Sequence, residues 1–278
     1  MTASVRGVRG VVLVLVTLWL SDFWATASAQ QEVVTLATRP GVTQSYFLTS
    51  IPKELGAVAI LFPGSGGLIQ LRDENGKPRF NTGNFLVRSR SEFIKNTVAA
   101  AILDAPSDQQ SGWGMSDAFR LGVDHLTDIA AVVGGLQRRF SGVPLFLVGT
   151  SRGTISAGSL GARLSQEVAG VVLTSTMFRQ TGKNSKEPGP GLSKFDFATI
   201  HVPLLFVHHA SDQCESTPYG DAARLADKYP LISVIGGSPP QSGPCDALSQ
   251  HGFLGREAET VEQMVNWMLK KPFRESVK

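Results

Sequence analysis

Five continuous apolar runs constrain the fold of this chain more than any other feature. They lie at residues 57–62, 98–103, 145–148, 168–173 and 204–207, and none alternates polar with apolar residues. Strands covered by helices on both faces have this composition, which is typical of a parallel sheet. A shorter run at 232–235 is expected to form the last strand of the sheet.

Helix-like segments separate these runs, at 84–96, 121–140, 154–164, 221–228 and 257–270. Two β-prone segments at 33–36 and 44–49 precede the first run. The turn signal Arg39-Pro-Gly41 lies between them, so we expect an antiparallel pair at the edge of the sheet. Alternating strands and helices predict one α/β domain, residues 30–278, whose mostly parallel sheet is covered by helices on both faces.

Residues 1–29 are typical of an export signal. Arg6 and Arg9 precede a ten-residue apolar segment at 11–20, and the small residues Ala27-Ser-Ala29 follow. Ten residues are too few for a helix to cross a hydrocarbon core of about 30 Å. We predict cleavage after Ala29 and a periplasmic or secreted protein, without stable membrane insertion afterwards. An uncleaved N-terminal anchor is the alternative.

The charge of the chain argues against a nucleic-acid partner. The formal net charge is +3, and loss of Arg6, Arg9 and Asp22 with the signal changes it to +2 (3 − 2 + 1). No cluster of lysines and arginines of the kind that follows a phosphate backbone is present.

The pattern Gly149-Thr-Ser151-Arg-Gly153 follows the apolar run at 145–148 and precedes a helix-like segment. Glycines two residues before and after the serine suit a sharp strand-to-helix turn, where side chains would strike neighbouring backbone. Such a turn exposes the serine hydroxyl, which makes Ser151 a candidate nucleophile. A loop serine between two flexible glycines is the alternative reading.

Two further loops carry an acid and a histidine, in the order that this kind of turn requires. Asp212 follows the strand-like run at 204–207, and His251 lies in a polar loop before the final helix. We predict that Asp212 orients His251 and that His251 is the general base, with Asp246 as the reserve candidate for the acid. A metal site is disfavoured, because adjacent His208 and His209 on a strand would point to opposite faces.

The loop Pro63-Gly-Ser65-Gly-Gly67 follows the first apolar run. Its glycines leave backbone N–H groups free to face a small anion. A phosphate loop would end in Gly-Lys-Ser/Thr, whereas Leu68 follows here. We therefore predict an oxyanion hole formed by the backbone N–H groups of Ser65 and Arg152.

The chain contains two cysteines, Cys214 and Cys245. An even number in an exported protein indicates one disulfide, which would tie the loop of Asp212 to that of His251. Two free thiols are the alternative, and the spacing resembles no metal motif.

Together, the Gly-Thr-Ser-Arg-Gly turn, the Pro-Gly-Ser-Gly-Gly loop, Asp212 and the loop His251-Gly-Phe resemble the α/β-hydrolase superfamily, over nearly the whole mature chain. The segment 208–214 resembles poorly characterised exported bacterial serine hydrolases. The resemblance implies Ser151 as nucleophile, His251 as base, Asp212 as acid, and esters or related acyl compounds as substrates. Pro63-Gly64 stands where the family often has His-Gly.

The resulting expectation is a serine hydrolase for small or short-acyl carboxylic esters that needs no metal or organic cofactor. The segment between 174 and 204 is rich in glycine and proline and lacks a helical period, so no sizeable lid is expected. Residues 70–83 and 107–115, including Trp113, are expected to supply further substrate contacts. The alternatives are a catalytically silent binding protein, or a peptidase or transacylase using the same triad.

Overall fold

The computed structural model describes residues 1–3, 31–181 and 188–278. The predicted signal segment and its cleavage site lie almost entirely outside this part of the chain. Within the described residues the main sheet has nine strands, in the spatial order β1-β2-β6-β3-β7-β8-β9-β10-β11. The strands are β1 (Glu32–Arg39), β2 (Val42–Leu48), β3 (Ala57–Phe62), β6 (Val98–Leu103), β7 (Leu145–Thr150), β8 (Gly170–Thr174), β9 (Leu204–His209), β10 (Leu231–Val234) and β11 (Ser276–Val277).

The predicted arrangement of strands is confirmed for most of the sheet. β1 pairs antiparallel with β2 at one edge, β2 pairs antiparallel with β6, and the remaining neighbours are all parallel. Every residue of β3, β6 and β7 is buried, as the apolar runs predicted.

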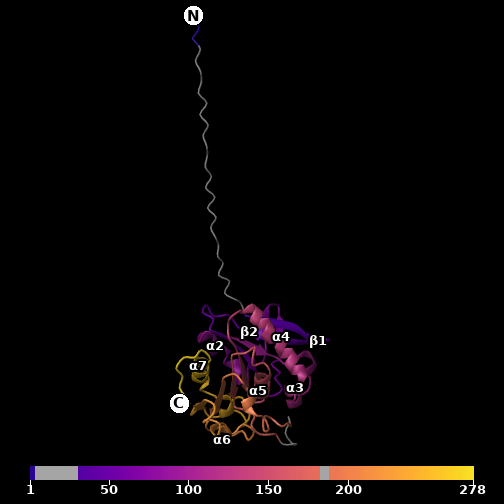
Figure 1. Cartoon of the computed structure of the whole chain (residues 1–278), viewed down its shortest axis with the longest axis vertical. Helices are drawn as coiled ribbons and strands as arrows, with labels where there is room; N and C mark the ends of the chain where they lie inside the picture. The colour runs from indigo at the N-terminus through magenta and orange to yellow at the C-terminus, as the bar shows by residue number, and fades with distance from the viewer. Residues whose placement is uncertain (4–30, 182–187) are drawn as a thin grey trace.

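Two hydrophobic clusters, one on each face of the sheet, form the core. One contains Val58 and Ile60 of β3 with the buried residues of α4 (Val123–Arg139) and α5 (Gly153–Arg163). The other contains Ala59 and Leu61 of β3 with α1 (Phe85–Arg88), α2 (Arg90–Lys95) and α7 (Glu257–Met268). Residues of β3 therefore alternate between the two clusters, as a pleated strand requires. Figure 1 shows α2 and α7 on one side of the domain and α4 on the other.

The helix boundaries differ from those predicted, because the sequence pattern did not reveal the short breaks between consecutive helices. The segment 84–96 is divided at Ser89 into α1 and α2, and α4 begins only after Gly122, preceded by the separate helix α3 (Asp117–Leu121). The helix expected at 221–228 is the shorter α6 (Tyr219–Ala223). None of the described helices is both long and apolar enough to cross a membrane.

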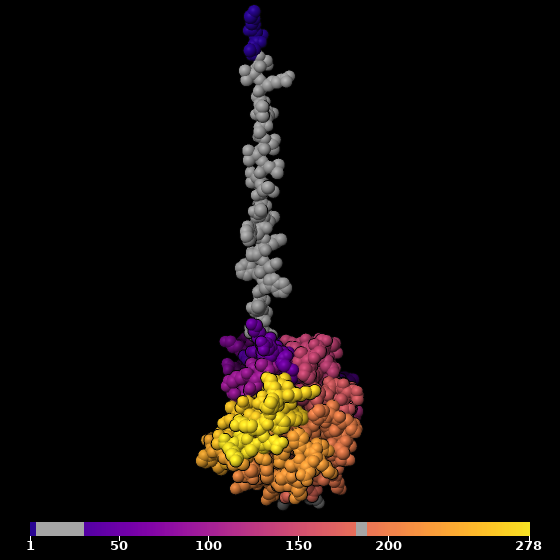
Figure 2. Space-filling model, turned by 60° about the vertical axis from the view of Figure 1, so that its left-hand side comes forward, coloured from indigo at the N-terminus to yellow at the C-terminus, as the bar shows by residue number. Residues whose placement is uncertain are grey.

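The strand expected at 232–235 is present as β10, but it is not the last strand of the sheet. β11 lies beyond β10 and pairs with it in parallel, and Val277 is buried there. A two-residue strand has no periodicity that a sequence could display. The C-terminal segment, yellow in Figure 2, packs on the surface of the domain beside purple residues of the N-terminal half, in agreement with the contact of α7 with α2.

A short hairpin was also missed within the loop 70–83. It consists of β4 (Arg72–Glu74) and β5 (Lys77–Arg79), which pair antiparallel across Asn75 and Gly76. Both turn residues have positive φ, 57° and 76°, which an Asn-Gly turn favours. The Asn-Gly dipeptide was thus an unused signal in the sequence.

Between β8 and β9 the described residues contain one 3₁₀ turn, η2 (Phe197–Thr199), and no α-helix. The expectation of no helical lid therefore agrees with this part of the segment, and residues 182–187 lie outside the described chain. The carboxyl ends of the parallel strands carry the loops in which chemistry is expected.

Candidate active site

Ser151 occupies a tight turn between β7 and α5. Its φ is +51°, in the left-handed region, and its N–H donates to the carbonyl oxygen of Thr174 at 3.0 Å. A Cβ on Gly149 would lie 2.4 Å from the Gly153 oxygen, and one on Gly153 would lie 2.0 Å from the Phe62 oxygen. Neither site can accommodate a side chain, as predicted for a strained strand-to-helix turn.

Asp212 and His251 lie in contact, although 39 residues separate them. His251 belongs to the 3₁₀ turn η3 (Gln250–Gly252), and its Nδ1 is 3.1 Å from Oδ2 of Asp212. Both side chains are almost completely buried. The other oxygen of Asp212, Oδ1, accepts from the N–H of Cys214 at 2.9 Å. The carboxylate is therefore held from two sides, which fixes the orientation of the imidazole.

Asp246, the reserve candidate, does not form this contact. Its side chain is exposed, and its Oδ2 accepts from the N–H of Gly243 at 3.1 Å. Of the two carboxylates considered, Asp212 is thus the one that the fold brings to His251.

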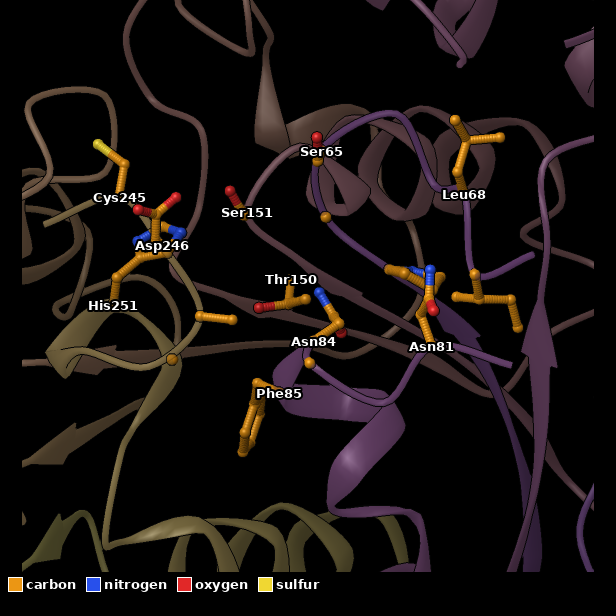
Figure 3. Close-up of a pocket in the computed structure, with 16 residues that line it drawn as sticks. Ser65, Leu68, Asn81, Asn84, Phe85, Thr150, Ser151, Cys245, Asp246 and His251 are labelled. Atoms are coloured by element: carbon orange, nitrogen blue, oxygen red, sulfur yellow. The ribbon is translucent and has the colours of Figure 1, made fainter. Parts of the chain in front are cut away.

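Ser151 and His251 line the same cavity, of about 280 Å³. In Figure 3 the Ser151 hydroxyl lies between the side chain of Ser65 and the loop that carries His251. Apolar residues form much of the wall, namely Pro63, Leu68, Ile69, Phe85 and Ala247. Nε2 of His251 is buried and has no hydrogen-bond partner among the described residues. Nε2 of His251 is therefore not hydrogen-bonded to the hydroxyl of Ser151 in this structure.

Thr217 is a member of this site that sequence reasoning missed. Its hydroxyl donates to Oδ2 of Asp212 at 2.9 Å and lies 3.1 Å from Nδ1 of His251. Thr217 is completely buried. No motif marks it, since it becomes part of the site only because the loop after β9 folds back on itself.

The backbone of the His251 loop is held by two further side chains that the sequence did not single out. The hydroxyl of Ser175 donates to the carbonyl oxygen of His251 at 2.7 Å. Nη2 of Arg88 donates to the carbonyl oxygens of Gly252 and Ala247, at 2.6 and 3.0 Å. These bonds place the imidazole relative to the sheet.

The adjacent histidines of β9 have separate structural partners. Nε2 of His208 accepts from the N–H of Thr176 at 3.0 Å, and Nε2 of His209 donates to the carbonyl oxygen of Gly236 at 2.9 Å. Burial lowers the pKa of His208 to about 3, so this side chain is neutral. In the parts of the chain that the structure describes, no three histidine, cysteine or carboxylate side chains are grouped as metal ligands.

The predicted oxyanion loop lies directly beside Ser151. A Cβ on Gly64 would be 3.0 Å from Cβ of Ser151, and Ser65 has a positive φ of 50°. Arg152 is the N-cap residue of α5, so its N–H belongs to the positive end of the helix. Ser65, Ser151 and Arg152 line one cavity.

Cys214 and Cys245 form a disulfide, as the sequence predicted. It links the loop after β9, which carries Asp212, to the loop that leads to His251. Cys245 also lines the cavity that contains Ser151.

A second, larger cavity of about 930 Å³ is also lined by Ser151. Ser65, Ser151, Cys245 and Asp246 line both cavities. The remaining wall of the larger cavity includes several polar side chains, namely Arg179, Gln180, Thr181, Gln213, Glu215 and Ser216.

The two loops expected to supply substrate contacts behave differently. Asn81 and Gly83 of loop 70–83 line the smaller cavity. No residue of loop 107–115 lines either cavity; this loop instead supports the oxyanion loop, with the N–H of Met115 donating to the Gly66 oxygen at 2.9 Å. Trp113 is 60% exposed.

A family model described as serine aminopeptidase, S33, matches residues 108–213. The match covers less than half of the chain and includes Ser151 and Asp212 but not His251. No curated protein sequence matches the chain at a significant level.

Solved structures of the same fold are similar over most of the chain. Est1E from Butyrivibrio proteoclasticus, with ferulic acid bound, is 16% identical with a TM-score of 0.56, over 86% of this chain and 100% of that one. A soluble variant of monoglyceride lipase from Saccharomyces cerevisiae, in complex with a substrate analogue, is 11% identical with a TM-score of 0.59, over 86% and 94%. A serine hydrolase without a lid from Xanthomonas campestris is 13% identical with a TM-score of 0.53, over 84% and 95%. At these identities the likeness establishes a shared fold, and the expected fold is confirmed.

Proposed function

We propose that this protein, an α/β-hydrolase by fold, is a serine hydrolase that cleaves small or short-acyl carboxylic esters through an acyl-enzyme intermediate. Ser151 is the nucleophile, His251 the general base and Asp212 the acid. One observation carries the proposal: His251, which is paired with the buried Asp212, lines the same cavity as Ser151 in its strained turn.

The chemistry begins when Oγ of Ser151 attacks the carbonyl carbon of the substrate while Nε2 of His251 takes its proton. Asp212 stabilises the imidazolium that forms, and Thr217 holds the same carboxylate oxygen. The N–H groups of Ser65 and Arg152 stabilise the oxyanion, each contributing about 3 kcal/mol to lowering the barrier. His251 then protonates the departing alcohol, and water releases the acyl group by the same steps in reverse.

The size and lining of the smaller cavity support a short substrate group beside Ser151. A volume of about 280 Å³ lies at the lower end of the range for ligand pockets. Its apolar walls suit a short aliphatic or small aromatic group, since burial of such groups is favourable. Two structures of the same fold are consistent with this reaction class: one is Est1E with ferulic acid bound, and another is a monoglyceride lipase in complex with a substrate analogue.

We further propose that residues 1–29 direct export and that residues 30–278 form the mature domain. The disulfide supports this location, because such bonds persist in oxidising compartments and are rare in the cytosol.

A peptidase is the second candidate, favoured by the family model described as a serine aminopeptidase. The same triad can cleave an amide bond, so the nucleophile does not distinguish the two. Hydrolysis rates on matched ester and amide substrates with one acyl group would separate them. An amide cleaved at least as fast as its ester would favour the peptidase.

The decisive test is covalent labelling by a fluorophosphonate probe, with the modified residue identified by mass spectrometry. We expect labelling at Ser151 of the purified protein and none in Ser151→Ala or His251→Ala. Both variants should lose activity by orders of magnitude, because triad members act as a unit. Ser111→Ala, in an exposed loop, is the matched control and should label normally. A folded Ser151→Ala protein with full activity would show that Ser151 is not the nucleophile. A folded wild type that is neither labelled nor active would instead support a silent binding protein.

The absence of a helical lid among the described residues of 175–203 gives a second test. We expect soluble short-acyl esters to be hydrolysed best, with no jump in rate when the substrate concentration passes its solubility limit. A strong preference for emulsified long-chain lipids would contradict this expectation.

A further inference from the structure

We propose that Arg120 is a positioning residue for the oxyanion hole, and that helix α3 braces both of the residues that supply its N–H groups. This inference rests on the proposed function, since it concerns the stabilisation of the reaction's oxyanion.

Arg120 joins the oxyanion loop to the helix that follows the nucleophile. Its side chain is completely buried, with 0% exposed. Nη2 donates to the carbonyl oxygen of Ser65 at 2.7 Å, and Nη1 donates to the hydroxyl of Ser156 in α5 at 2.8 Å. A guanidinium is planar and rigid, so two such bonds fix the distance between the groups that they join. Arg120 therefore sets the position of Ser65 relative to α5, which begins two residues after Ser151.

Ser65 needs such an anchor because of its backbone. It is a non-glycine residue with a φ of +50°, and glycines stand on both of its sides. Glycine gives a loop no side chain with which to hold itself in one conformation. The bond from Arg120 to its carbonyl oxygen holds this residue in the strained conformation. The N–H of Ser65 then points in a fixed direction, which oxyanion stabilisation requires.

The second donor residue is held by the same helix. Asp117, one turn before Arg120 in α3, forms an ion pair with the guanidinium of Arg152. The side chains of both partners are nearly inaccessible, at 2% and 6% exposure. The other oxygen of Asp117 accepts from the N–H of Gly191 at 2.9 Å. Residues three apart lie on one face of a helix, so a single face of α3 contacts both Ser65 and Arg152.

The positive charge of Arg120 acts in the same direction as its hydrogen bonds. The buried guanidinium of Arg120 is bonded to the carbonyl oxygen of Ser65. The N–H of the same residue is the proposed donor to the oxyanion, where negative charge develops in the transition state. Charge interactions are stronger in a buried environment than in water. The charge therefore favours the transition state over the neutral ground state, and its loss should lower kcat more than it raises KM.

The test compares Arg120→Met and Arg120→Lys with the wild type on one soluble ester and on its thiono analogue, in which sulfur replaces the carbonyl oxygen. Sulfur is a poor hydrogen-bond acceptor, so the rate ratio of the two substrates reports on the oxyanion hole. We expect Arg120→Met to lower kcat for the ester by about 10- to 100-fold, with KM within about twofold. The ratio of ester to thionoester rates should fall, and Arg120→Lys should recover part of it.

Arg163→Met is the matched control. Arg163 also bonds backbone carbonyls, those of Leu121 and Gly122, and a serine hydroxyl of α5, that of Ser159, but it is exposed and does not touch the oxyanion loop. We expect its substrate ratio to equal that of the wild type. An equal fall of the ratio in Arg163→Met would overturn the inference, because general loosening of α5 would then explain both.

Ser156→Ala keeps the inference testable if Arg120→Met does not fold. It removes the anchor of Arg120 on α5 and leaves the charge in place. We expect a several-fold lower kcat and a lower ratio, with active-site titration by fluorophosphonate used to count folded sites. An unchanged ratio in a folded Arg120→Met or Ser156→Ala protein would overturn this inference alone. A wild type that is neither active nor labelled at Ser151 would overturn the proposed function and this inference with it.

Discussion

At the scale of single residues, the hydroxyl of Thr217 is shared between the two partners of the acid–base pair. It donates to Oδ2 of Asp212, the same oxygen that contacts Nδ1 of His251. A hydrogen bond to a charged group is worth about 1.5–3 kcal/mol. Thr217 therefore helps decide which oxygen of the carboxylate faces the imidazole, a role that its place in the sequence does not reveal.

Replacement of Thr217 by valine should lower kcat by about 10-fold, because the carboxylate loses one of the bonds that fix its orientation. KM should change little, since no substrate contact is removed. Thr217→Ser keeps the hydroxyl and should remain within about twofold of the wild type. Steady-state kinetics over a range of pH measure both variants. Equal kcat values for valine and serine would show that the hydroxyl plays no part.

The Ser151 turn also requires a residue without a side chain at position 153. In Gly153→Ala the new Cβ would lie 2.0 Å from the carbonyl oxygen of Phe62, so the backbone must move. Overpacking of this kind costs about 1–3 kcal/mol or more, which corresponds to a fall in Tm of about 5–10 °C in a domain of this size. Probe labelling at Ser151 should also fall strongly.

Gly220→Ala is the control for this substitution. Gly220 lies exposed within α6, and nothing stands within 4 Å of an added Cβ. Alanine there should raise Tm slightly, by about 2 °C, because it favours the helix. Differential scanning fluorimetry measures both variants. A Gly153→Ala protein as stable and as reactive as the wild type would show that the turn is not under the constraint described.

At the scale of elements, the site depends on two loops that follow the neighbouring parallel strands β9 and β10. The loop after β9 supplies Asp212 and Thr217, and the loop before α7 supplies His251. The Cys214–Cys245 disulfide joins them across a sequence separation of 31 residues. The N–H of Cys214 also bonds Oδ1 of Asp212, so the cystine and the carboxylate share one turn.

Reduction of this disulfide should lower stability by about 3–4 kcal/mol in the chain-entropy model, or Tm by about 10 °C. Reduction should also lower kcat, because the loop that carries Asp212 is then no longer linked to the loop that leads to His251. Thermal unfolding and kinetics with and without a reductant measure the effects. The double variant Cys214→Ala/Cys245→Ala is the control and should not respond to reductant. Unchanged kinetics of the reduced wild type would show that the disulfide stabilises the fold without organising the site.

At the scale of the whole molecule, two neutral histidines are buried in the domain. Burial lowers the pKa of His208 to about 3, and burial followed by the charge of Arg120 lowers the pKa of His125 well below its ordinary value. In the unfolded chain both take up a proton near pH 6.5. Between about pH 6.5 and 3 the unfolded state therefore binds more protons, and stability falls as the pH falls.

We expect the free energy of unfolding to drop by about 2 kcal/mol from His208 alone between pH 7.5 and 5, with a further loss from His125. Urea unfolding at the two pH values measures the total. Imidazole NMR signals assign the contribution of His208, because burial lowers its pKa to about 3 and its signal should therefore stay that of the neutral form in this range. A His208 signal that titrates near pH 6.5 would contradict the prediction.

The sequence by itself determined the parts of this protein that depend on local burial and local backbone conformation. Uninterrupted apolar runs placed the central parallel strands, since a strand covered on both faces has no polar side. The spacing of Gly149, Ser151 and Gly153 predicted the tight turn, because backbone crowding there excludes any side chain. The pair of cysteines, together with the export signal predicted from the sequence, predicted the disulfide.

Only the tertiary structure decided which distant side chains meet. Asp212 rather than Asp246 contacts His251, Thr217 and Ser175 hold that pair, and Arg120 reaches Ser65 across 55 residues. The parallel pairing of β11 with β10 is likewise a contact between segments far apart in the sequence. Such contacts depend on how the loops at the strand ends are packed together. The local sequence around a residue does not predict that packing.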